Sequence, residues 1–384
     1  MEKRSRLKPS LVFVGMPEMI DRRLLTNIDW ILAGLVVAVC LLGIVNIYSA
    51  TSSYKIVATP YYIKQIYWFL VGMSIALMVC MVDYHILEDL SYWFYGVVII
   101  LLVAVLVIGR RSMGATRWLN LGLFNIQPSE LMKIVIIITF ARFFSNYQTV
   151  GGLTVKDMLF PLGLLSIPAL LIMKQPDLGT AVIVILVAIS ITVYRGLRWS
   201  TVVTFSLVTL PVLWLGWSHF LRPYQKNRVL DFLNPERSRL GSGYHIIQSK
   251  IAVGSGGFIG KGFLKGTQSQ LQFLPEQHTD FAFSVFSEEW GFVGCLVLIL
   301  LYLSLVLWGL NIARRCNDRF GALLAVGVTA MLFWHIVINM GMVIGLFPVV
   351  GVPMPFFSYG GTSMITSMVG IGILQNISMR RFMF

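Results

Sequence analysis

The chain has 384 residues, of which 57% are hydrophobic and only 12% are charged. Soluble domains contain about 45–50% apolar residues, and several runs here exceed the ~18 apolar residues that mark a membrane span. A soluble fold is therefore excluded. The net charge of +13 does not indicate a nucleic-acid partner, because basic residues must first be divided between the two faces of a membrane.

Ten apolar segments predict an all-α polytopic membrane protein, because a backbone in contact with acyl chains must be helical. The expected spans are 28–50, 61–82, 90–109, 127–145, 157–174, 177–195, 199–220, 284–312, 320–345 and 361–379. Residues 1–27 form a polar, basic tail, and residues 28–384 form a single transmembrane domain. A long loop at 221–283 separates the seventh and eighth predicted helices.

The distribution of Lys and Arg predicts that both termini are cytoplasmic. Outside the long loop, about twice as many of these residues fall on the side of the termini as on the other side. The long loop is then external, and it is strongly basic. Such a surface suggests an anionic ligand outside the membrane. Plain solubility, or attraction to anionic lipid head groups, is the alternative explanation.

The segment GRRSMGATRWLNLGLFNIQPSELMK places Arg117 just before a helix that opens with Pro128, a residue favoured in a first turn. That helix points its N-terminus outward and presents free N–H groups to an anion. Glu130 and Lys133 are three residues apart and share one face. Two interpretations stay open: a buried ion pair that pins two helices, or a site where Lys133 and Arg117 hold phosphate and Glu130 orients Lys133.

Asp177, in the segment KQPDLGT, is predicted to be a helix cap. The long loop opens with YQKNR and continues as GSGYHIIQSKIAVGSGGFIGKGFLKGTQ. Its glycines allow N–H nests for phosphate, and they are equally typical of a mobile loop. The spacing is not that of a nucleotide P-loop. Gln225, Arg228 and Lys250 are the candidates in this loop for contacting an anion.

The segment LQFLPEQHTDFAFSVFSEEWGFVG concentrates ionisable side chains at the edge of a predicted span, and these are Glu276, His278, Asp280, Glu288 and Glu289. Carboxylates at a membrane boundary are costly and therefore indicate a functional site. The alternative is a solvated loop, with Glu288 and Glu289 stabilised by the dipole of the following helix. Phe281 and Phe283 are expected to desolvate Asp280 and raise its pKa.

The segment GMVIGLFPVVGVPMPFFSYGGTS predicts irregular backbone at membrane depth, which is tolerated only where it lines a cavity or is buried in protein. Ser358 and Tyr359 are candidates for lining such a cavity, although a packing element is favoured. The four cysteines have neither disulfide nor metal-site spacing, and we expect them to be packing residues.

Together these motifs resemble the SEDS family (shape, elongation, division and sporulation) of bacterial membrane proteins, over nearly the whole chain from the first span onward. The specific pieces are GATRWLNLG, QPSELMK, QPDLGTA, YQKNRVLDFLNP, GYHIIQSKIAVGSGG, FLPEQHTDFAFSVFSEEWGFVG and GLFPVVGVPMPFFSYGG. Within the family, LPEQHTDF and VVGVPMPF are more similar to the elongation branch than to the division branch.

The resemblance implies a peptidoglycan glycosyltransferase that polymerises lipid II, through undecaprenyl-pyrophosphate-linked glycan, at the outer face of the bacterial cytoplasmic membrane. It makes Asp280 the expected catalytic base and gives functional roles to Arg117, Glu130 and Lys133. It also implies a class B penicillin-binding protein as partner, contacts with membrane lipids and with other proteins of the elongation complex, and dependence on Mg or Mn. The sequence identifies no ligands for that cation.

The residues support this chemistry independently. Pyrophosphate is a good leaving group, so one base with cationic stabilisation should suffice, whereas glycosidases need two carboxyl groups. Asp280 is the base candidate, and Glu276, Glu288 and Glu289 are its rivals. We interpret Glu276 as a loop or metal-orienting residue, Glu288 and Glu289 as helix-start residues, and His278 as a hydrogen-bonding loop residue. Glu276, His278 and Ser358 are expected to support Asp280. The alternatives are a lipid II flippase, a division-type polymerase and a non-catalytic scaffold. A flippase needs a polar path to the inner face, whereas most ionisable residues of the spans cluster outside.

Overall fold

The computed structural model describes residues 27–53, 59–112, 115–120, 125–147, 151–220, 223–238, 241–274 and 276–381. The predicted tail therefore lies outside the described residues, apart from Asn27. All ten predicted spans are helices, and their bounds are α2 (Trp30–Thr51), α3 (Tyr61–Met81), α4 (His85–Ile108), α5 (Pro128–Asn146), α6 (Leu159–Lys174), α7 (Leu178–Arg195), α8 (Trp199–Leu215), α12 (Ala282–Arg315), α13 (Arg319–Ile344) and α14 (Gly361–Arg380). The orientation of the termini stays a prediction.

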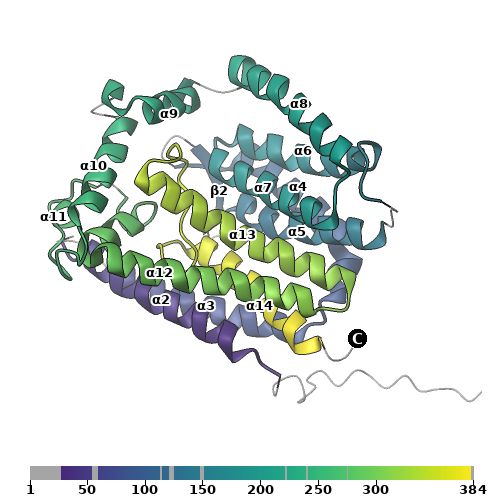
Figure 1. Cartoon of the computed structure of the whole chain (residues 1–384), viewed down its shortest axis with the longest axis horizontal. Helices are drawn as coiled ribbons and strands as arrows, with labels where there is room; N and C mark the ends of the chain where they lie inside the picture. Colours follow the sequence, from purple (N-terminus) through teal and green to yellow (C-terminus); the bar gives the residue numbers. More distant parts are fainter. Residues whose placement is uncertain are drawn as a thin grey trace, which may run out of the picture.

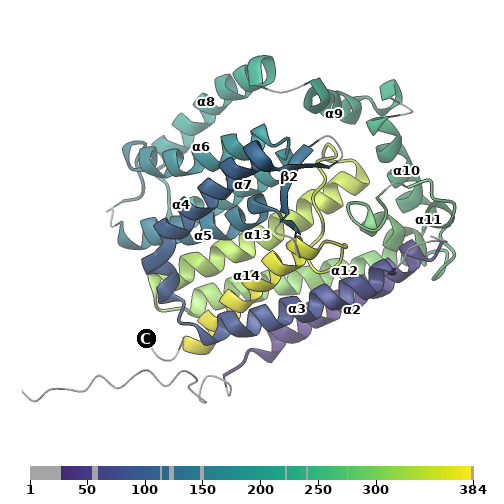
Figure 2. The same cartoon turned by 180° about the vertical axis from the view of Figure 1, so that it is seen from behind.

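Within the described residues, eight helical segments are long and apolar enough to cross a membrane, and they do not include α5 and α14. These two helices are nevertheless almost entirely buried. α5 packs against α4, α7 and α13, and α14 packs against α3, as the view from behind shows (Figure 2). Because neighbouring helices shield them from lipid, α5 and α14 carry polar side chains that an outer helix could not.

The predicted long loop is largely helical. It contains α9 (Pro223–Leu233), the 3₁₀ turn η3 (Pro235–Ser238), α10 (Ser242–Ser255) and the short α11 (Thr267–Gln270). Figure 1 shows α8, α9, α10 and α11 following one another around the rim of the bundle. Two further turns, η1 (Lys156–Met158) and η2 (Gly216–Phe220), extend α6 and α8.

A small antiparallel sheet is the one departure from an all-α fold among the described residues. Its strands are β1 (Arg110–Ser112), β2 (Ala115–Asn120) and β3 (Asn125–Ile126), in the order β1-β2-β3. In the registered pairs, Arg111 faces Thr116 and Leu119 faces Ile126. The sheet connects α4 to α5 and brings the Arg117 segment over the start of α5.

Helix α12 is broken at Gly291, whose φ of 63° and ψ of −161° lie outside the helical region. The glycine-rich segment after α10 docks its backbone into this break. The N–H of Phe292 donates to the carbonyl of Gly257 at 3.0 Å. A Cβ on Gly260, which has a φ of +90°, would come within 2.1 Å of the carbonyl oxygen of Glu289. These glycines therefore serve close backbone packing, and no phosphate nest is needed to explain them.

The side chain of Glu288 also holds this segment to α12, in addition to the backbone contacts at Gly291. It is fully buried and accepts hydrogen bonds from Lys261 Nζ at 2.7 Å, Thr267 Oγ1 at 3.0 Å and the backbone N–H of Gln268 at 3.1 Å. Neighbouring Glu289 accepts from Ser49 of α2. Both carboxylates lie beyond the first turn of α12, so the interpretation as helix-start residues is wrong. Glu288 holds the segment after α10 to α12, and Glu289 holds α12 to α2.

Candidate active site

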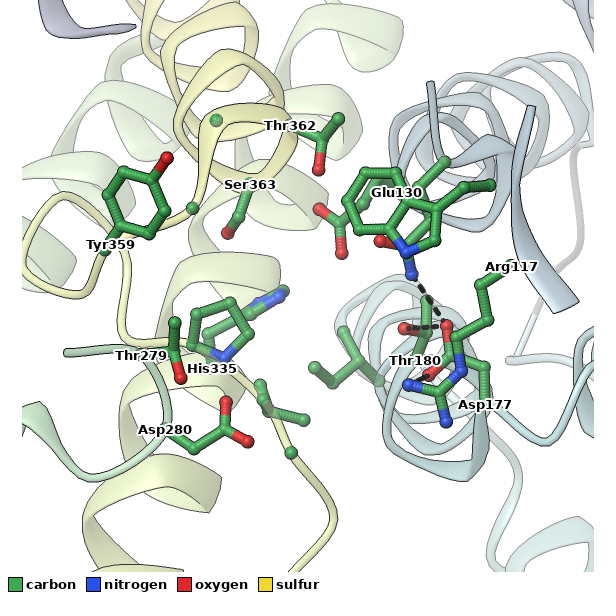
Figure 3. Close-up of a pocket in the computed structure, with 18 of the residues that line it drawn as sticks. Arg117, Glu130, Asp177, Thr180, Thr279, Asp280, His335, Tyr359, Thr362 and Ser363 are labelled. Atoms are coloured by element: carbon green, nitrogen blue, oxygen red, sulfur yellow. Dashed lines mark hydrogen bonds and ion pairs between the residues drawn. The ribbon is translucent and has the colours of Figure 1, made fainter. Parts of the chain in front are cut away.

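One cavity at an end of the bundle gathers several of the polar residues that the sequence singled out (Figure 3). Its volume is about 530 Å³, within the ~300–1,000 Å³ typical of ligand pockets. Its wall comes from β2, the first turns of α5, α7 and α14, the turn before α12, and α13. Four helix N-termini therefore converge on the cavity, and their free N–H groups and dipoles favour an anionic ligand.

Asp280 lies on one wall, in the turn that leads into α12, and Figure 3 shows its carboxylate facing the cavity. Burial raises the pKa of Asp280 to about 6, and the negative charge of Glu276 acts in the same direction. The cations Arg228 and Arg117 oppose this rise. A carboxylate with a pKa near neutrality accepts a proton more readily than an ordinary one, so Asp280 has the property that a general base needs.

The opposite wall carries Arg117 and Asp177 (Figure 3). Arg117 donates to the carbonyl of Pro176, and its Nη1 lies 3.8 Å from Asp177 Oδ1. The other oxygen of Asp177 accepts from side chains, and the donors are Gln127 Nε2 at 2.9 Å, Ser129 Oγ at 3.0 Å and Thr180 Oγ1 at 2.9 Å. Asp177 occupies the N-cap position of α7 without accepting from a backbone N–H there. The cap prediction is thus correct in position and wrong in hydrogen bonding.

The side of the cavity formed by α5 and α13 carries a buried triad. Lys133 Nζ lies 2.7 Å from Glu130 Oε2 and 2.8 Å from His335 Nε2. His335 Nδ1 is 2.8 Å from the carbonyl of Met331, so that nitrogen carries the proton and Nε2 accepts from Lys133. Glu130 and His335 line the cavity, whereas Lys133 is 1% exposed and lies behind them. The structure therefore shows the predicted ion pair, with Lys133 set back from direct contact with a ligand.

Three predicted anion-binding residues of the long loop lie away from the cavity wall. Arg228 of α9 donates to the carbonyl of Val349 at 3.0 Å and acts on Asp280 through its charge. Gln225 is buried in α9. Lys250 is exposed on α10, with its side chain against Gly345 at the end of α13. Of the three, Arg228 is the one whose charge acts on Asp280.

The predicted supporting residues flank Asp280 rather than face the cavity. Glu276 is exposed and has a left-handed φ of 50°. His278 packs its ring 4.3 Å from that of Tyr61 and its carbonyl accepts from the N–H of Tyr359. Ser358 is buried and its Oγ accepts from the N–H of Met354 at 3.1 Å. Ser358 therefore has the favoured packing role, whereas Gly351, Val352 and Tyr359 of the same segment line the cavity, as the alternative predicted.

Comparison with known proteins decides the family. Residues 29–382 match the family model of FtsW, RodA and SpoVE, described as "Cell cycle protein". This chain belongs to that family, the SEDS family. It is 44% identical over 315 residues to the Escherichia coli protein named "Peptidoglycan glycosyltransferase MrdB", and the match covers 81% of this chain and 84% of the relative.

Two solved SEDS-family structures have the same fold. One comes from the work "Structural coordination of polymerization and crosslinking by a peptidoglycan synthase complex", with a TM-score of 0.79, 34% identity, and coverage of 93% of this chain and 99% of that chain. The other is the rod shape determining protein RodA of Thermus thermophilus, with a TM-score of 0.69, 30% identity, and coverage of 92% and 98%. The predicted family and helical membrane fold are confirmed.

The described residues form no protein-only binding site for the cation that the SEDS resemblance implies. Among the described residues, no group of three or more His, Cys, Asp or Glu side chains is arranged to hold a metal ion. Asp280 and Glu130 reach the cavity from different walls, one carboxylate each. Mg²⁺ is usually held by one or two carboxylates together with substrate phosphates, so dependence on Mg or Mn stays a prediction.

Among the ionisable residues that line the SEDS cavity, sequence reasoning missed His335. It sits in the middle of an apolar helix, and nothing in its local sequence separates a cavity histidine from a packing one. Only the tertiary structure brings it next to Lys133, 202 residues earlier in the chain. A single histidine in the most buried of the candidate spans was the available signal, because an ionisable group at such a position needs a partner.

Proposed function

We infer that this chain is a peptidoglycan glycosyltransferase that polymerises lipid II at the outer face of the cytoplasmic membrane during cell elongation. The relative named MrdB supports the activity. The observation that carries the mechanism is Asp280, with a pKa of about 6, in a cavity onto which four helix N-termini converge. A proton acceptor and a site for a departing anion are thus in one cavity.

In the proposed step, a sugar hydroxyl of one substrate attacks the anomeric carbon of the other. Asp280 takes the hydroxyl proton as the new C–O bond forms. The bond from the anomeric carbon to the pyrophosphate oxygen breaks, and its electron pair leaves with the lipid pyrophosphate. The charge of the leaving group is stabilised by Arg117 and by the N-termini of α5, α7 and α14.

The buried triad has a separate role in this proposal. Lys133 holds a positive charge behind Glu130 and His335, and it fixes the orientation of both groups toward the cavity. Asp177 orients Arg117 in the same way through its Oδ1 atom. The Oδ2 atom of Asp177 accepts three hydrogen bonds, and these keep the carboxylate in place. Arg117, Glu130 and His335 are therefore each held in place by a charged partner, as preorganised stabilisation of a transition state requires.

The partner is proposed to be a class B penicillin-binding protein. The similar chain that belongs to a peptidoglycan synthase complex supports this, because that complex coordinates polymerisation with crosslinking. Contacts with other proteins of the elongation complex are proposed on the same basis. Both termini are proposed to be cytoplasmic, which places the Asp280 cavity at the outer face.

The test is glycan-chain formation from purified lipid II by the chain together with its partner. Asp280→Asn keeps the shape of the side chain and removes its basicity, and we expect a loss of ~10²–10⁴-fold in rate. Retained polymerisation by this variant would remove Asp280 from the mechanism. Movement of labelled lipid II across vesicles without polymer formation would instead favour the flippase alternative, and wild-type polymerisation that is unaffected by any change at Asp280 would favour a scaffold.

A further inference from the structure

Asn339, near the C-terminal end of α13, is fully buried and is not part of the cavity wall. Its side-chain amide donates two hydrogen bonds, one to the carbonyl of Asp280 at 2.9 Å and one to the carbonyl of Val352 at 2.7 Å. Because both neighbours are carbonyl oxygens, the NH₂ end of the amide must face them. One side chain thus joins the turn that carries the base to the loop that precedes α14.

The second bond matters because that loop forms the wall beside the base. Gly351 and Val352 line the cavity together with Asp280. Gly351 has a φ of +72°, and a Cβ built on it would lie 3.2 Å from Asp280 Oδ2. The backbone of this loop therefore passes close beside the carboxylate, with little room for a side chain between them. The amide of Asn339 fixes both sides of this close approach.

This arrangement has a cost that packing alone does not explain. The Oδ1 atom of Asn339 is buried and has no hydrogen-bond partner within the described part of the chain. An unsatisfied buried acceptor destabilises a fold, and an apolar residue of similar size would avoid it. Natural proteins break such rules mainly at functional sites.

We propose that Asn339 is a positioning residue for the glycosyl-transfer reaction, which holds the Asp280 turn and the Gly351–Val352 wall at the separation that keeps the carboxylate aimed into the cavity. The inference rests on the proposed function, since it gives Asn339 its role through the base. The charged groups that face Asp280 are Glu276 in its own turn, Arg228 of α9, Arg117 of β2 and Asp177 before α7, and none of them takes the place of this amide.

Asn376 provides a control for the loss of a buried amide. It lies near the C-terminal end of α14, whereas the cavity is at the N-terminal end of that helix. Asn376 is also a buried amide (1% exposed) in a helix, and its Nδ2 also donates to two backbone carbonyls, those of Val79 and Val82. Replacing either asparagine by leucine, which has the same branching, removes two bonds donated to backbone carbonyls. In Asn376→Leu the bond that Oδ1 accepts from Arg380 Nε at 2.9 Å is lost as well, so this control should lose at least as much stability. Only Asn339 is connected to the base, so the two variants separate loss of stability from loss of positioning.

The experiment measures lipid II polymerisation by the complex with its partner, as kcat and KM per folded molecule, for wild type, Asn339→Leu, Asn376→Leu and Asp280→Asn. We expect Asn339→Leu to lower kcat by about 10–100-fold with KM changed less than about threefold, as misplacement of a catalytic group does. The acid limb of its pH profile should also move to lower pH, because a loosened turn exposes the Asp280 carboxylate to water. Asn376→Leu should lose comparable thermal stability and keep both kcat and the acid limb.

Asn339→Ser, which retains one donor, serves if the leucine variant fails to fold, and it should show a smaller loss of kcat in the same direction. A wild-type kcat and acid limb in the Asn339 variants, or the same changes in Asn376→Leu, would overturn the positioning role. Polymerisation by Asp280→Asn would overturn the proposed function itself, and with it the premise of this inference. The two failures are therefore distinguishable in one set of measurements.

Discussion

The pH dependence of polymerisation tests the environment of Asp280 directly. Asp280 must be ionised to accept a proton, and burial together with Glu276 raises its pKa to about 6. At pH 5 about a tenth of the molecules then carry the ionised form, and the rate falls about tenfold for each further pH unit. The wild-type rate should be nearly constant above about pH 7. An ordinary surface aspartate would keep its activity down to about pH 4.

Two neighbours of opposite sign make the prediction specific. Glu276→Gln removes an anion that raises the pKa of Asp280, so the acid limb should move to lower pH. Arg228→Gln removes a cation that lowers this pKa, so the limb should move to higher pH. Arg228→Lys keeps the charge and serves as the control, with a limb close to that of the wild type.

The assay is the initial rate of lipid II polymerisation by the purified complex between pH 4.5 and 8, at low ionic strength because Glu276 is exposed and salt screens its charge. Each variant is compared with its own plateau, so a change in substrate binding does not disturb the result. Shifts of both variants in the same direction, or a wild-type limb near pH 4, would refute the assignment of the limb to Asp280 in this electrostatic environment.

Four further outcomes are expected. His335→Leu should lower stability by about 1–3 kcal/mol, measured by thermal unfolding in detergent, because Lys133 loses one of its two buried partners. Gly260→Ala should destabilise by a similar amount, since its Cβ would strike a backbone carbonyl, whereas Gly254→Ala, with nothing within 4 Å, should not. Glu288→Ala should cost about 2–3 kcal/mol and increase proteolysis of the segment after α10, because a buried carboxylate with three donors is lost. Removal of divalent cations with a chelator should slow polymerisation, and addition of Mg or Mn should restore it; an unchanged rate would contradict the expected cation dependence.

The sequence is sufficient for eight of the ten predicted helices because lipid imposes a simple rule on them: long apolar runs must be helical. The more polar α5 and α14 are predicted from shorter apolar runs. It is also sufficient to single out Asp280, Arg117 and Glu130, since charged groups at a membrane boundary are few and costly. The segment 221–283 resembles a loop in sequence because its helices are short and amphipathic in a basic, glycine-rich background. The sheet before α5 escapes prediction for a similar reason, since its strands are too short for a recognisable alternation.

Other features depend on tertiary contacts that no local pattern encodes. His335 and Asn339 look like ordinary polar interruptions of α13, and their roles arise from Lys133 and from the carbonyl of Asp280, far away in the chain. The glycines after α10 are compatible in sequence with a phosphate nest, and only the break of α12 at Gly291 shows what they pack against. Lys250 is a reasonable anion-binding candidate by charge, and the path of α10 directs it elsewhere.

The central position of α5 has a consequence for how the protein is made. This helix carries Glu130, Lys133 and Arg142, of which Lys133 pairs with Glu130 within the helix. A charge opposes insertion by ~2.5–3.5 kcal/mol at the centre of a span and by less toward its ends, where these residues lie. Arg142 finds its partners on α4, which is synthesised earlier, but Lys133 pairs with His335 of α13, which leaves the ribosome some 200 residues later. We therefore expect α5 to remain unsettled in the bilayer through most of translation, dependent on an insertase or on α4 until α13 arrives. Chains truncated before α13 should be substrates for membrane proteases.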